Sequence, residues 1–280
     1  MLIAANGIEL WVEQHGDPDG VPIVLLSGSD ATTLRWPASL VAPLAADGRR
    51  VITYDHRDSG ASTKVDPDAP YRLDTLAADA CALFDAMGID AAHLVGYSMG
   101  GAVAQIVALD APGRVRSLTL IATTPGSGDE RLPFAADWFV ERMAERLFAP
   151  PPRTHDDRVA WIVELYRLLA GSRVVFDEAG QRAIADAEIA RSWYPESGHG
   201  VAVGSSPSRL DDLARITART LVVHGTADPV YALGHAYALA EGISNARLVV
   251  IDGLGHEVPA GFGAELAALI LEHIATPPFL

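Results

Sequence analysis

The sequence predicts an α/β protein with a mostly parallel central sheet, flanked by helices and interrupted by a helical insertion. Short apolar runs alternate with helix-like segments in the first part of the chain, fade between residues 125 and 218, and return at 219. Strands separated by helices of about 10–15 residues are typical of βαβ units, whose strands run parallel. Because the last part resumes the alternation of the first, we expect one core, residues 1–124 and 219–280, with a helical cap at 125–218.

The individual elements follow from apolar runs bounded by turn residues. The predicted strands are Ile8–Val12, Ile23–Leu26, Arg50–Tyr54, His93–Gly96, Leu118–Ala122, Thr220–His224 and Arg247–Ile251. The predicted core helices are Pro37–Ala46, Leu73–Met87, Met99–Leu109, Leu233–Glu241 and Ala260–Ile274. Gly88 is expected to cap the second helix, because glycine readily adopts the left-handed conformation found there. The turn-rich segment 16–20 joins the first two strands, which are expected to form an antiparallel lead-in to the sheet.

Bulky side chains in the insertion recur at helical spacing, which predicts amphipathic helices there. Six of them are candidates to line a pocket for an aromatic acyl group: Trp138, Phe139, Met143, Trp161, Trp193 and Tyr194. Helical spacing alone also predicts that these residues form the insertion's own core. Both interpretations stay open at this point.

Composition and charge exclude several classes of protein. With 280 residues, of which 49% are apolar, the chain can bury a sizeable core. The 21 basic and 36 acidic residues give a net charge of −15, which repels nucleic acids and anionic membrane surfaces. No apolar run reaches membrane-spanning length and the first residues lack an export signal, so we expect a cytoplasmic protein. The single cysteine, Cys81, cannot form an internal disulfide and is expected to be a buried packing thiol.

The sharpest local signal is the pentapeptide Gly96–Gly100, which lies between a predicted strand and a predicted helix. At such a turn the central residue, Ser98, adopts a strained conformation that projects its hydroxyl, and the glycines remove side chains that would collide. The helix that follows also directs free N–H groups and a positive dipole end toward a developing oxyanion. Ser98 is therefore the candidate nucleophile.

A serine hydroxyl needs a histidine base and an acid that orients it. Nine histidines compete, but His256 directly follows the last predicted strand in a glycine-rich loop, at the sheet edge where Ser98 also emerges. Asp228 follows the preceding strand at that edge and is the favoured acid. Asp252 is the main competitor, but it lies so close to His256 in sequence that it is poorly placed to orient the imidazole.

A nucleophilic serine also needs donors for the oxyanion. The loop after the strand Ile23–Leu26 is the expected source of one donor, the backbone N–H of Ser29, and the residue after the nucleophile, Met99, supplies the other.

These elements together resemble the α/β-hydrolase fold over nearly the whole chain. Ser98, Asp228 and His256 stand in the family's order, and the insertion follows the strand Leu118–Ala122, where the family commonly inserts a lid. The segment Tyr54–Ser62 is similar to the family's D-x-R-G-x-G-x-S loop. The resemblance implies a serine hydrolase that needs no cofactor.

Two departures point to a narrower resemblance. Ser27–Gly28 stands where the family often has His-Gly, and Asp58 replaces the first glycine of the arginine loop. Both features are similar to the aclacinomycin (anthracycline) methylesterase group, as are Leu10–Trp11, the G-x-S-M-G pentapeptide and Ala108–Asp110. The resemblance implies a carboxylesterase that acts on methyl esters of polyketide-like aromatic substrates.

The same triad is compatible with other reactions. A lactonase, a C–C bond hydrolase or a metal-free perhydrolase of the haloperoxidase type would carry it too, and a hydrolase-like fold could serve as a small-molecule receptor. A metal site is not expected, because no H-E-x-x-H or C-x-x-C pair occurs in the sequence. The expected partner is a small-molecule ester, and the sequence leaves the oligomeric state open.

Overall fold

The computed structural model describes residues 1–275, which form an eight-stranded sheet in the order β1-β2-β4-β3-β5-β6-β7-β8. The strands are β1 (Leu2–Ala5), β2 (Ile8–Gly16), β3 (Val21–Leu26), β4 (Arg49–Tyr54), β5 (Ala92–Tyr97), β6 (Val115–Ile121), β7 (Thr220–Gly225) and β8 (Ala246–Ile251). From β4 through β8 every neighbouring pair is parallel, whereas β1 and β2 run antiparallel. The predicted α/β class with a mostly parallel sheet is confirmed.

The antiparallel edge differs in detail from the prediction. β2 pairs with β4 and not with β3, so the turn at 16–20 joins two strands that are not neighbours. β1 was not predicted, because it has only four residues at the start of the chain. Its hairpin with β2 turns at Asn6 and Gly7, whose φ values are +48° and +76°. Asn-Gly is a strong hairpin signal and could have revealed this strand.

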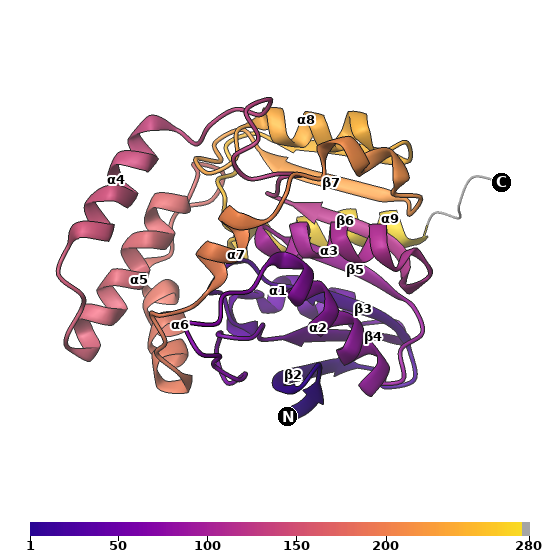
Figure 1. Ribbon diagram of the computed structural model, residues 1–280, viewed down its shortest axis with the longest axis horizontal. Coiled ribbons are helices and arrows are strands. Elements are labelled where there is room, and N and C mark those ends of the chain that lie inside the picture. The colour runs from indigo at the N-terminus through magenta and orange to yellow at the C-terminus, as the bar shows by residue number, and fades with distance from the viewer. Residues whose placement is uncertain (276–280) are drawn as a thin grey trace.

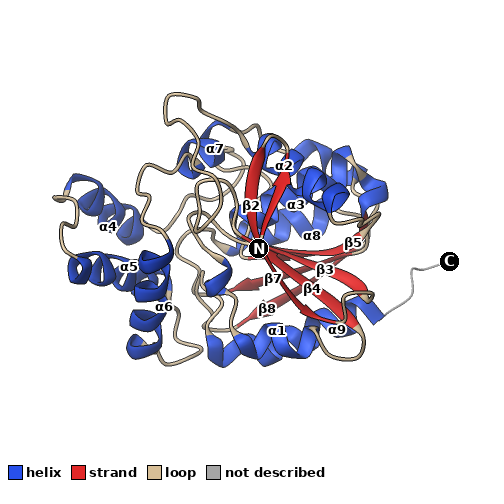
Figure 2. Cartoon of the chain, turned by 90° about the horizontal axis from the view of Figure 1, so that it is seen from below, coloured by secondary structure: helices blue, strands red, loops and turns tan. Residues whose placement is uncertain are grey.

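Helices cover both faces of the sheet (Figure 2). On one face lie α1 (Ala38–Leu44) and α9 (Gly263–Ala275), and on the other α2 (Leu73–Ala86), α3 (Met99–Asp110) and α8 (Leu233–Gly242). Each face buries its own apolar core, and consecutive residues of β3 alternate between the two cores. This explains why β3 reads as an unbroken apolar run.

Short 3-10 helices connect several of these elements. They are η1 (Thr33–Arg35), η2 (Pro112–Arg114), η3 (Leu210–Arg215) and η4 (Ala260–Phe262). The last predicted helix, from residue 260, is in fact η4 followed by α9. Gly88 follows α2 with a φ of +65°, as a C-terminal cap requires.

The segment between β6 and β7 forms the cap. Its helices are α4 (Asp137–Phe148), α5 (His155–Leu169), α6 (Glu178–Arg191) and α7 (His199–Ser205). Figure 1 shows α4 and α5 projecting beyond the sheet, with α6 and α7 closer to it. Residues 122–219, all of which the structure describes, contain no strand. Within the described residues 1–275, no helix is long and apolar enough to cross a bilayer.

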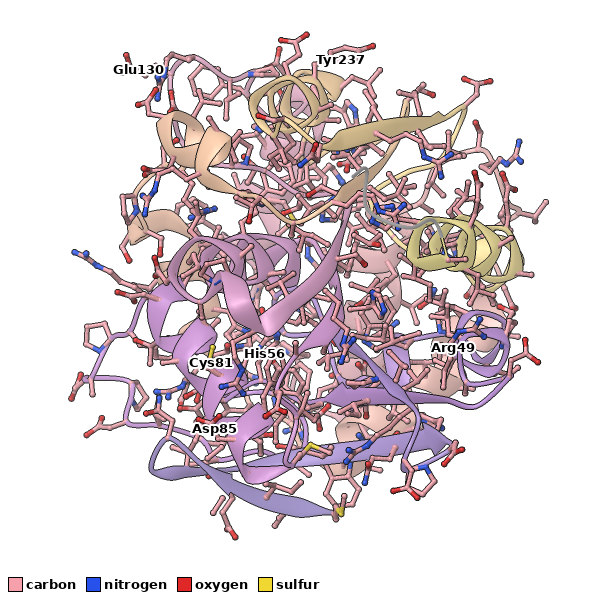
Figure 3. All side chains as sticks on the ribbon, turned by 90° about the vertical axis from the view of Figure 1, so that its right-hand side faces the viewer. Arg49, His56, Cys81, Asp85, Glu130 and Tyr237 are labelled. Atoms are coloured by element: carbon pink, nitrogen blue, oxygen red, sulfur yellow. The ribbon has the colours of Figure 1, made fainter. Side chains whose placement is uncertain are left out.

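A buried ion pair anchors the loop after β4 to α2. The Arg57 guanidinium donates from Nε to Asp79 Oδ2 at 2.7 Å and from Nη2 to Asp79 Oδ1 at 2.6 Å. Both residues are buried, so each charge depends on the other for compensation. Figure 3 labels two further residues of α2, Cys81 and Asp85. Cys81 is half-buried, and burial raises the pKa of its thiol.

We expect Asp79→Asn to lower the free energy of unfolding by about 3–5 kcal/mol, because it leaves the Arg57 charge buried and uncompensated. Asp85→Asn is the matched control, since Asp85 lies on the same helix and pairs with Arg114 at the surface. Removing that exposed pair should cost less than about 1 kcal/mol. Urea denaturation followed by circular dichroism measures both, and equal losses would contradict the assignment.

Candidate active site

Ser98 occupies the turn between β5 and α3, at the carboxyl end of the sheet. Its φ of +52° and ψ of −120° lie in a backbone region that residues with a side chain rarely adopt. Two contacts hold this conformation: the Ser98 N–H donates to the Ile121 carbonyl at 2.9 Å, and the Thr123 hydroxyl donates to the Ser98 carbonyl at 2.6 Å. The strain is thus maintained by β6 and the residues after it.

Glycines around Ser98 are required by close backbone approach. A Cβ atom on Gly96 would lie 2.5 Å from the Gly101 Cα, and one on Gly100 would collide with the Leu26 carbonyl oxygen. The spacing of the pentapeptide therefore lets α3 pack directly against β3 and β5. The same approach aims the Ser98 side chain away from the sheet edge.

Three side chains that are distant in the sequence form one hydrogen-bonded chain. His256 Nε2 lies 2.9 Å from Ser98 Oγ, and His256 Nδ1 lies 2.8 Å from Asp228 Oδ2. A carboxylate can only accept, so Nδ1 carries the hydrogen, and Nε2 is left with a lone pair that accepts from the serine hydroxyl. This is the arrangement in which an imidazole removes a hydroxyl proton.

Asp228 is held as an anion in a buried position. Its Oδ1 accepts from the backbone N–H groups of Val230 at 2.8 Å and Tyr231 at 3.0 Å. Burial acts to raise the pKa of Asp228, but the charge and hydrogen bond of His256, helped by His224 and the Tyr231 N–H, bring it below its ordinary value. His224 donates from Nε2 to the Tyr231 carbonyl at 2.7 Å, and burial lowers the pKa of its imidazole.

The competing acid lies elsewhere. Asp252 Oδ1 accepts from the Thr226 hydroxyl at 3.1 Å at the protein surface. Of the other histidines, His93, His235 and His273 contact groups outside the Ser98 turn. The structure therefore brings Ser98 together with Asp228 and His256 and leaves Asp252 apart.

The cap contributes a backbone contact to the histidine. The His256 N–H donates to the carbonyl of Leu169, the last residue of α5, at 2.8 Å. The rings of Tyr97 and Tyr231 flank the imidazole, with centroids 5.4 and 5.7 Å from it. Core side chains thus flank the imidazole, while the cap holds the backbone of His256.

The loop after β3 passes close to Ser98. A Cβ atom on Gly28 would lie 2.8 Å from the Tyr97 ring and 3.3 Å from Ser98 Cβ, so a larger residue here would require the Tyr97 ring to shift. The predicted oxyanion donors, the N–H groups of Ser29 and Met99, form no hydrogen bond with any group within residues 1–275. That both N–H groups donate to an oxygen placed beside Ser98 stays a prediction.

A histidine of the cap holds this loop. His199 Nδ1 accepts from the Asp30 N–H at 2.9 Å, while its Nε2 donates to the Arg57 carbonyl at 2.8 Å. The ring is completely buried. Asp30 has a φ of +58°, so the loop turns sharply just after Ser29. Sequence reasoning missed His199, because nothing in its neighbourhood indicates a partner 169 residues away.

Asp58 explains one departure from the family pattern. It occupies the left-handed region with a φ of +68°, which is where a glycine would be favoured. Its Oδ2 accepts from the Tyr71 hydroxyl at 2.7 Å and from the Gly198 N–H at 3.1 Å, while Oδ1 accepts from the Val65 N–H at 2.8 Å. The aspartate thereby links the loop after β4 to the residue that precedes α7.

Of the six candidate pocket residues, four contact other residues of the cap, whereas Tyr194 contacts the core. Trp193 packs against the buried cluster of α5 and α6, and Trp161 stacks under the Arg146 guanidinium at 4.0 Å. Trp138 is half exposed and its ring meets that of Phe139 edge-on, whereas Tyr194 donates to the Val65 carbonyl. Met143 is half-buried on α4. Two pockets lie next to the Ser98 turn, one lined in part by Met99 and the other by Tyr97. None of the six candidate residues lines either pocket.

A second charged cluster joins the cap to the core next to His256. Arg35 donates from Nε to Glu188 Oε2 at 3.0 Å and from Nη1 to Gln181 Oε1 at 2.6 Å. Gln181 in turn donates to Glu257 Oε2 at 3.0 Å. Burial raises the pKa of Glu257 to about 7, although the Arg35 charge opposes the rise. Residues 1–275 contain no group of three or more His, Cys, Asp or Glu side chains that could hold a metal ion.

Known proteins resemble this chain in sequence and in structure. The family described as alpha/beta hydrolase fold matches residues 21–260. The chain is 36% identical over 290 residues to rhodomycin D methylesterase DauP of Streptomyces sp. (strain C5), with 97% of each chain covered. It is 34% identical over 290 residues to rhodomycin D methylesterase DnrP of Streptomyces peucetius, again with 97% of each covered. The esterase RhEst1 from Rhodococcus sp. ECU1013 superposes with a TM-score of 0.82 at 20% identity, covering 98% of both chains.

Glu257 makes stability depend on pH. Between pH 4.5, its ordinary pKa, and about 7, the folded protein keeps a proton that the unfolded chain releases. The contribution of Glu257 to the free energy of unfolding therefore falls as pH rises through this window. The free energy of unfolding of Glu257→Gln should rise relative to that of the parent protein as the pH increases. We expect this difference to change by about 2–3 kcal/mol between about pH 5 and pH 8.

Chemical denaturation at both pH values measures this gain. Glu265→Gln, at an exposed position of α9, is the control and should show no comparable change. A Glu257→Gln difference that stays constant with pH would contradict the expected protonation.

Proposed function

The chain belongs to the alpha/beta hydrolase fold family, which matches residues 21–260, and from this premise we propose that it is a serine carboxylic ester hydrolase acting through an acyl-enzyme. The observation that carries the proposal is the hydrogen-bonded chain from Ser98 through His256 to Asp228. Hydrogen bonds of this length allow a proton to pass from hydroxyl to imidazole without rearrangement of the site.

In the first half-reaction, Ser98 Oγ attacks the ester carbonyl carbon while His256 Nε2 takes the hydroxyl proton. The carbonyl oxygen becomes an oxyanion, which the N–H groups of Ser29 and Met99 stabilise. Collapse of this intermediate breaks the bond to the alcohol, and the alcohol oxygen leaves with the proton from His256. The acyl group remains on Ser98.

In the second half-reaction, water attacks the acyl carbon and gives a proton to His256 Nε2. The bond to Ser98 Oγ then breaks, the proton returns to that oxygen, and the carboxylic acid is released. Asp228 holds the imidazole with its hydrogen on Nδ1 and stabilises the imidazolium in both halves. The lowered pKa of Asp228 keeps this carboxyl ionised for that role.

For the substrate we propose methyl esters of polyketide-like aromatic acids. The support is the name of two relatives, both rhodomycin D methylesterases, at 36% and 34% identity over nearly the whole chain. Lactones, perhydrolysis and C–C bond cleavage are the alternatives for the same triad. A panel of aryl methyl esters, lactones, vinylogous diketones and a carboxylic acid with hydrogen peroxide separates them by kcat/KM.

Ser98→Ala should abolish the burst of alcohol release from a chromogenic ester and lower kcat about 10⁴- to 10⁶-fold. The alanine should also prevent covalent labelling by a fluorophosphonate, because it removes the hydroxyl that lies against His256 Nε2. Ser117→Ala, a buried serine that pairs with His93 far from this turn, is the control. Unchanged turnover in a folded Ser98→Ala protein would overturn the proposed function.

His199→Phe should lower kcat about 10- to 100-fold with little change in KM, because the Ser29 donor loses the contact that positions its loop. His273→Phe is the matched control, since it removes another buried histidine, whose Nε2 donates to the Arg219 carbonyl before β7. It should lower stability and leave kcat unchanged. Equal kcat for His199→Phe and the parent protein would show that the oxyanion loop does not depend on His199.

A further inference from the structure

Arg209 is a buried cation without a carboxylate partner. It lies just before η3, where the chain returns from the cap to the core, and is 6% exposed. Within residues 1–275 its guanidinium donates to two carbonyls, from Nη1 to Pro207 at 3.2 Å and from Nη2 to Thr124 at 3.5 Å. Its Nε is buried and has no hydrogen-bond partner in the described part of the chain.

Other buried arginines of this protein differ in this respect. Arg57 pairs with Asp79 and Arg146 with Glu164. No salt bridge involves Arg209 within residues 1–275. Burial lowers the pKa of Arg209 to about 10, although the charge interaction with Tyr231 acts to raise it. An uncompensated buried charge is costly, and such groups cluster at functional sites.

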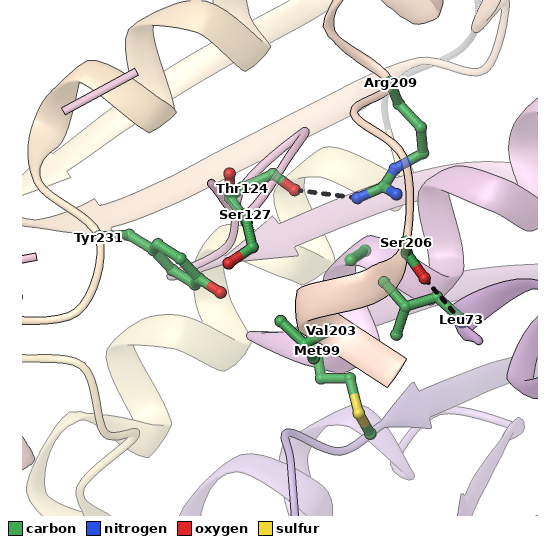
Figure 4. Close-up of a pocket in the computed structure, with 9 residues that line it drawn as sticks. Leu73, Met99, Thr124, Ser127, Val203, Ser206, Arg209 and Tyr231 are labelled. Carbon is green, nitrogen blue, oxygen red and sulfur yellow. Dashed lines mark hydrogen bonds between the residues drawn. The ribbon is translucent and has the colours of Figure 1, made fainter. Parts of the chain in front are cut away.

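The Arg209 side chain lines a pocket beside the nucleophile (Figure 4). Met99, which follows Ser98, and Tyr231, whose ring contacts that of His256, form part of its wall. Ser127 and Ser206 also line the pocket, and the Ser206 hydroxyl accepts from the Leu73 N–H at 3.0 Å. The free space is about 10 Å³, roughly enough for one water, so binding of a larger group requires the pocket to widen.

We propose that Arg209 binds a second, negatively charged oxygen group, such as a carboxylate, on the acyl part of the substrate. The inference rests on the proposed function and specifies its substrate class. An acyl anion would supply the counter-ion that the protein omits and would occupy the unused Nε donor. The acyl carbon would remain beside Ser98, because the pocket adjoins the turn that carries the nucleophile. Selectivity would then depend on a charge on the acid and not on the alcohol.

The substrates for the test are monomethyl esters of straight-chain dicarboxylic acids of increasing length. Each acidic ester is compared with the ester in which an uncharged amide replaces the free carboxylate. The rate of methanol release is measured for both. The parent protein should prefer the best acidic ester over its amide by about 10- to 100-fold in kcat/KM. Arg209→Met should reduce this ratio toward one, and Arg209→Lys should restore part of it. Arg215→Met, which removes an exposed arginine of η3, should leave the ratio unchanged.

Binding gives a readout that does not require turnover. In isothermal titration calorimetry with Ser98→Ala protein, the dicarboxylic acids should bind about 10- to 100-fold more tightly than their monoamides, and Arg209→Met should abolish the difference. Absence of turnover with every ester would count against the proposed function, whereas this binding preference would still hold.

Two results would overturn the inference. One is a parent protein with equal kcat/KM for the acidic ester and its amide, and with equal affinity for the dicarboxylic acid and its monoamide. The other is an Arg209→Met protein that loses activity equally on both esters, which would mean that Arg209 only tethers the Thr124 and Pro207 carbonyls. If Arg209→Met does not fold, the acid-to-amide comparison in the parent protein alone decides.

Discussion

The strained turn at Ser98 is the constraint on which the rest of the site depends. Its left-handed backbone is stable only because β3, β5 and β6 are in the right register to receive it: Gly100 packs on the Leu26 carbonyl, and Ile121 accepts from the Ser98 N–H. The same parallel register brings the loops after β7 and β8 to that edge. A hydroxyl, an imidazole and a carboxylate from three loops therefore meet at hydrogen-bond distance.

The fold and the side chains of Ser98, Asp228 and His256 could be predicted from the sequence, because both follow from local patterns. Alternating apolar runs and helices predict parallel strands, and parallel strands place their carboxyl ends at one edge. The short sequence separation between Asp252 and His256 favoured Asp228 as the acid, and the structure places Asp228 against His256 and Asp252 against Thr226. The hairpin at Asn6 carried a readable turn signal that the apolar pattern alone did not reveal.

The cap was less predictable for a physical reason. Helical spacing indicates that a face is buried but not what covers it, so Trp193 could equally have faced a ligand or the core of α5 and α6. His199 and Arg209 act through contacts with residues far away in the chain, and no local pattern encodes such contacts. Asp58 shows an intermediate case: its position in the motif was noticed, but its bond to the Gly198 N–H required the fold.

The contacts of the cap also bear on how such enzymes diversify. The Leu169 carbonyl supports the backbone of His256, and His199 supports the backbone of the loop that follows β3. Exchanging this cap for that of a relative would consequently replace contacts that support His256 and the loop after β3, together with the cap residues that line the pocket of Arg209. Chimeras of this architecture should preserve those two junctions, and evolution of new selectivity here is expected to proceed by point changes between them.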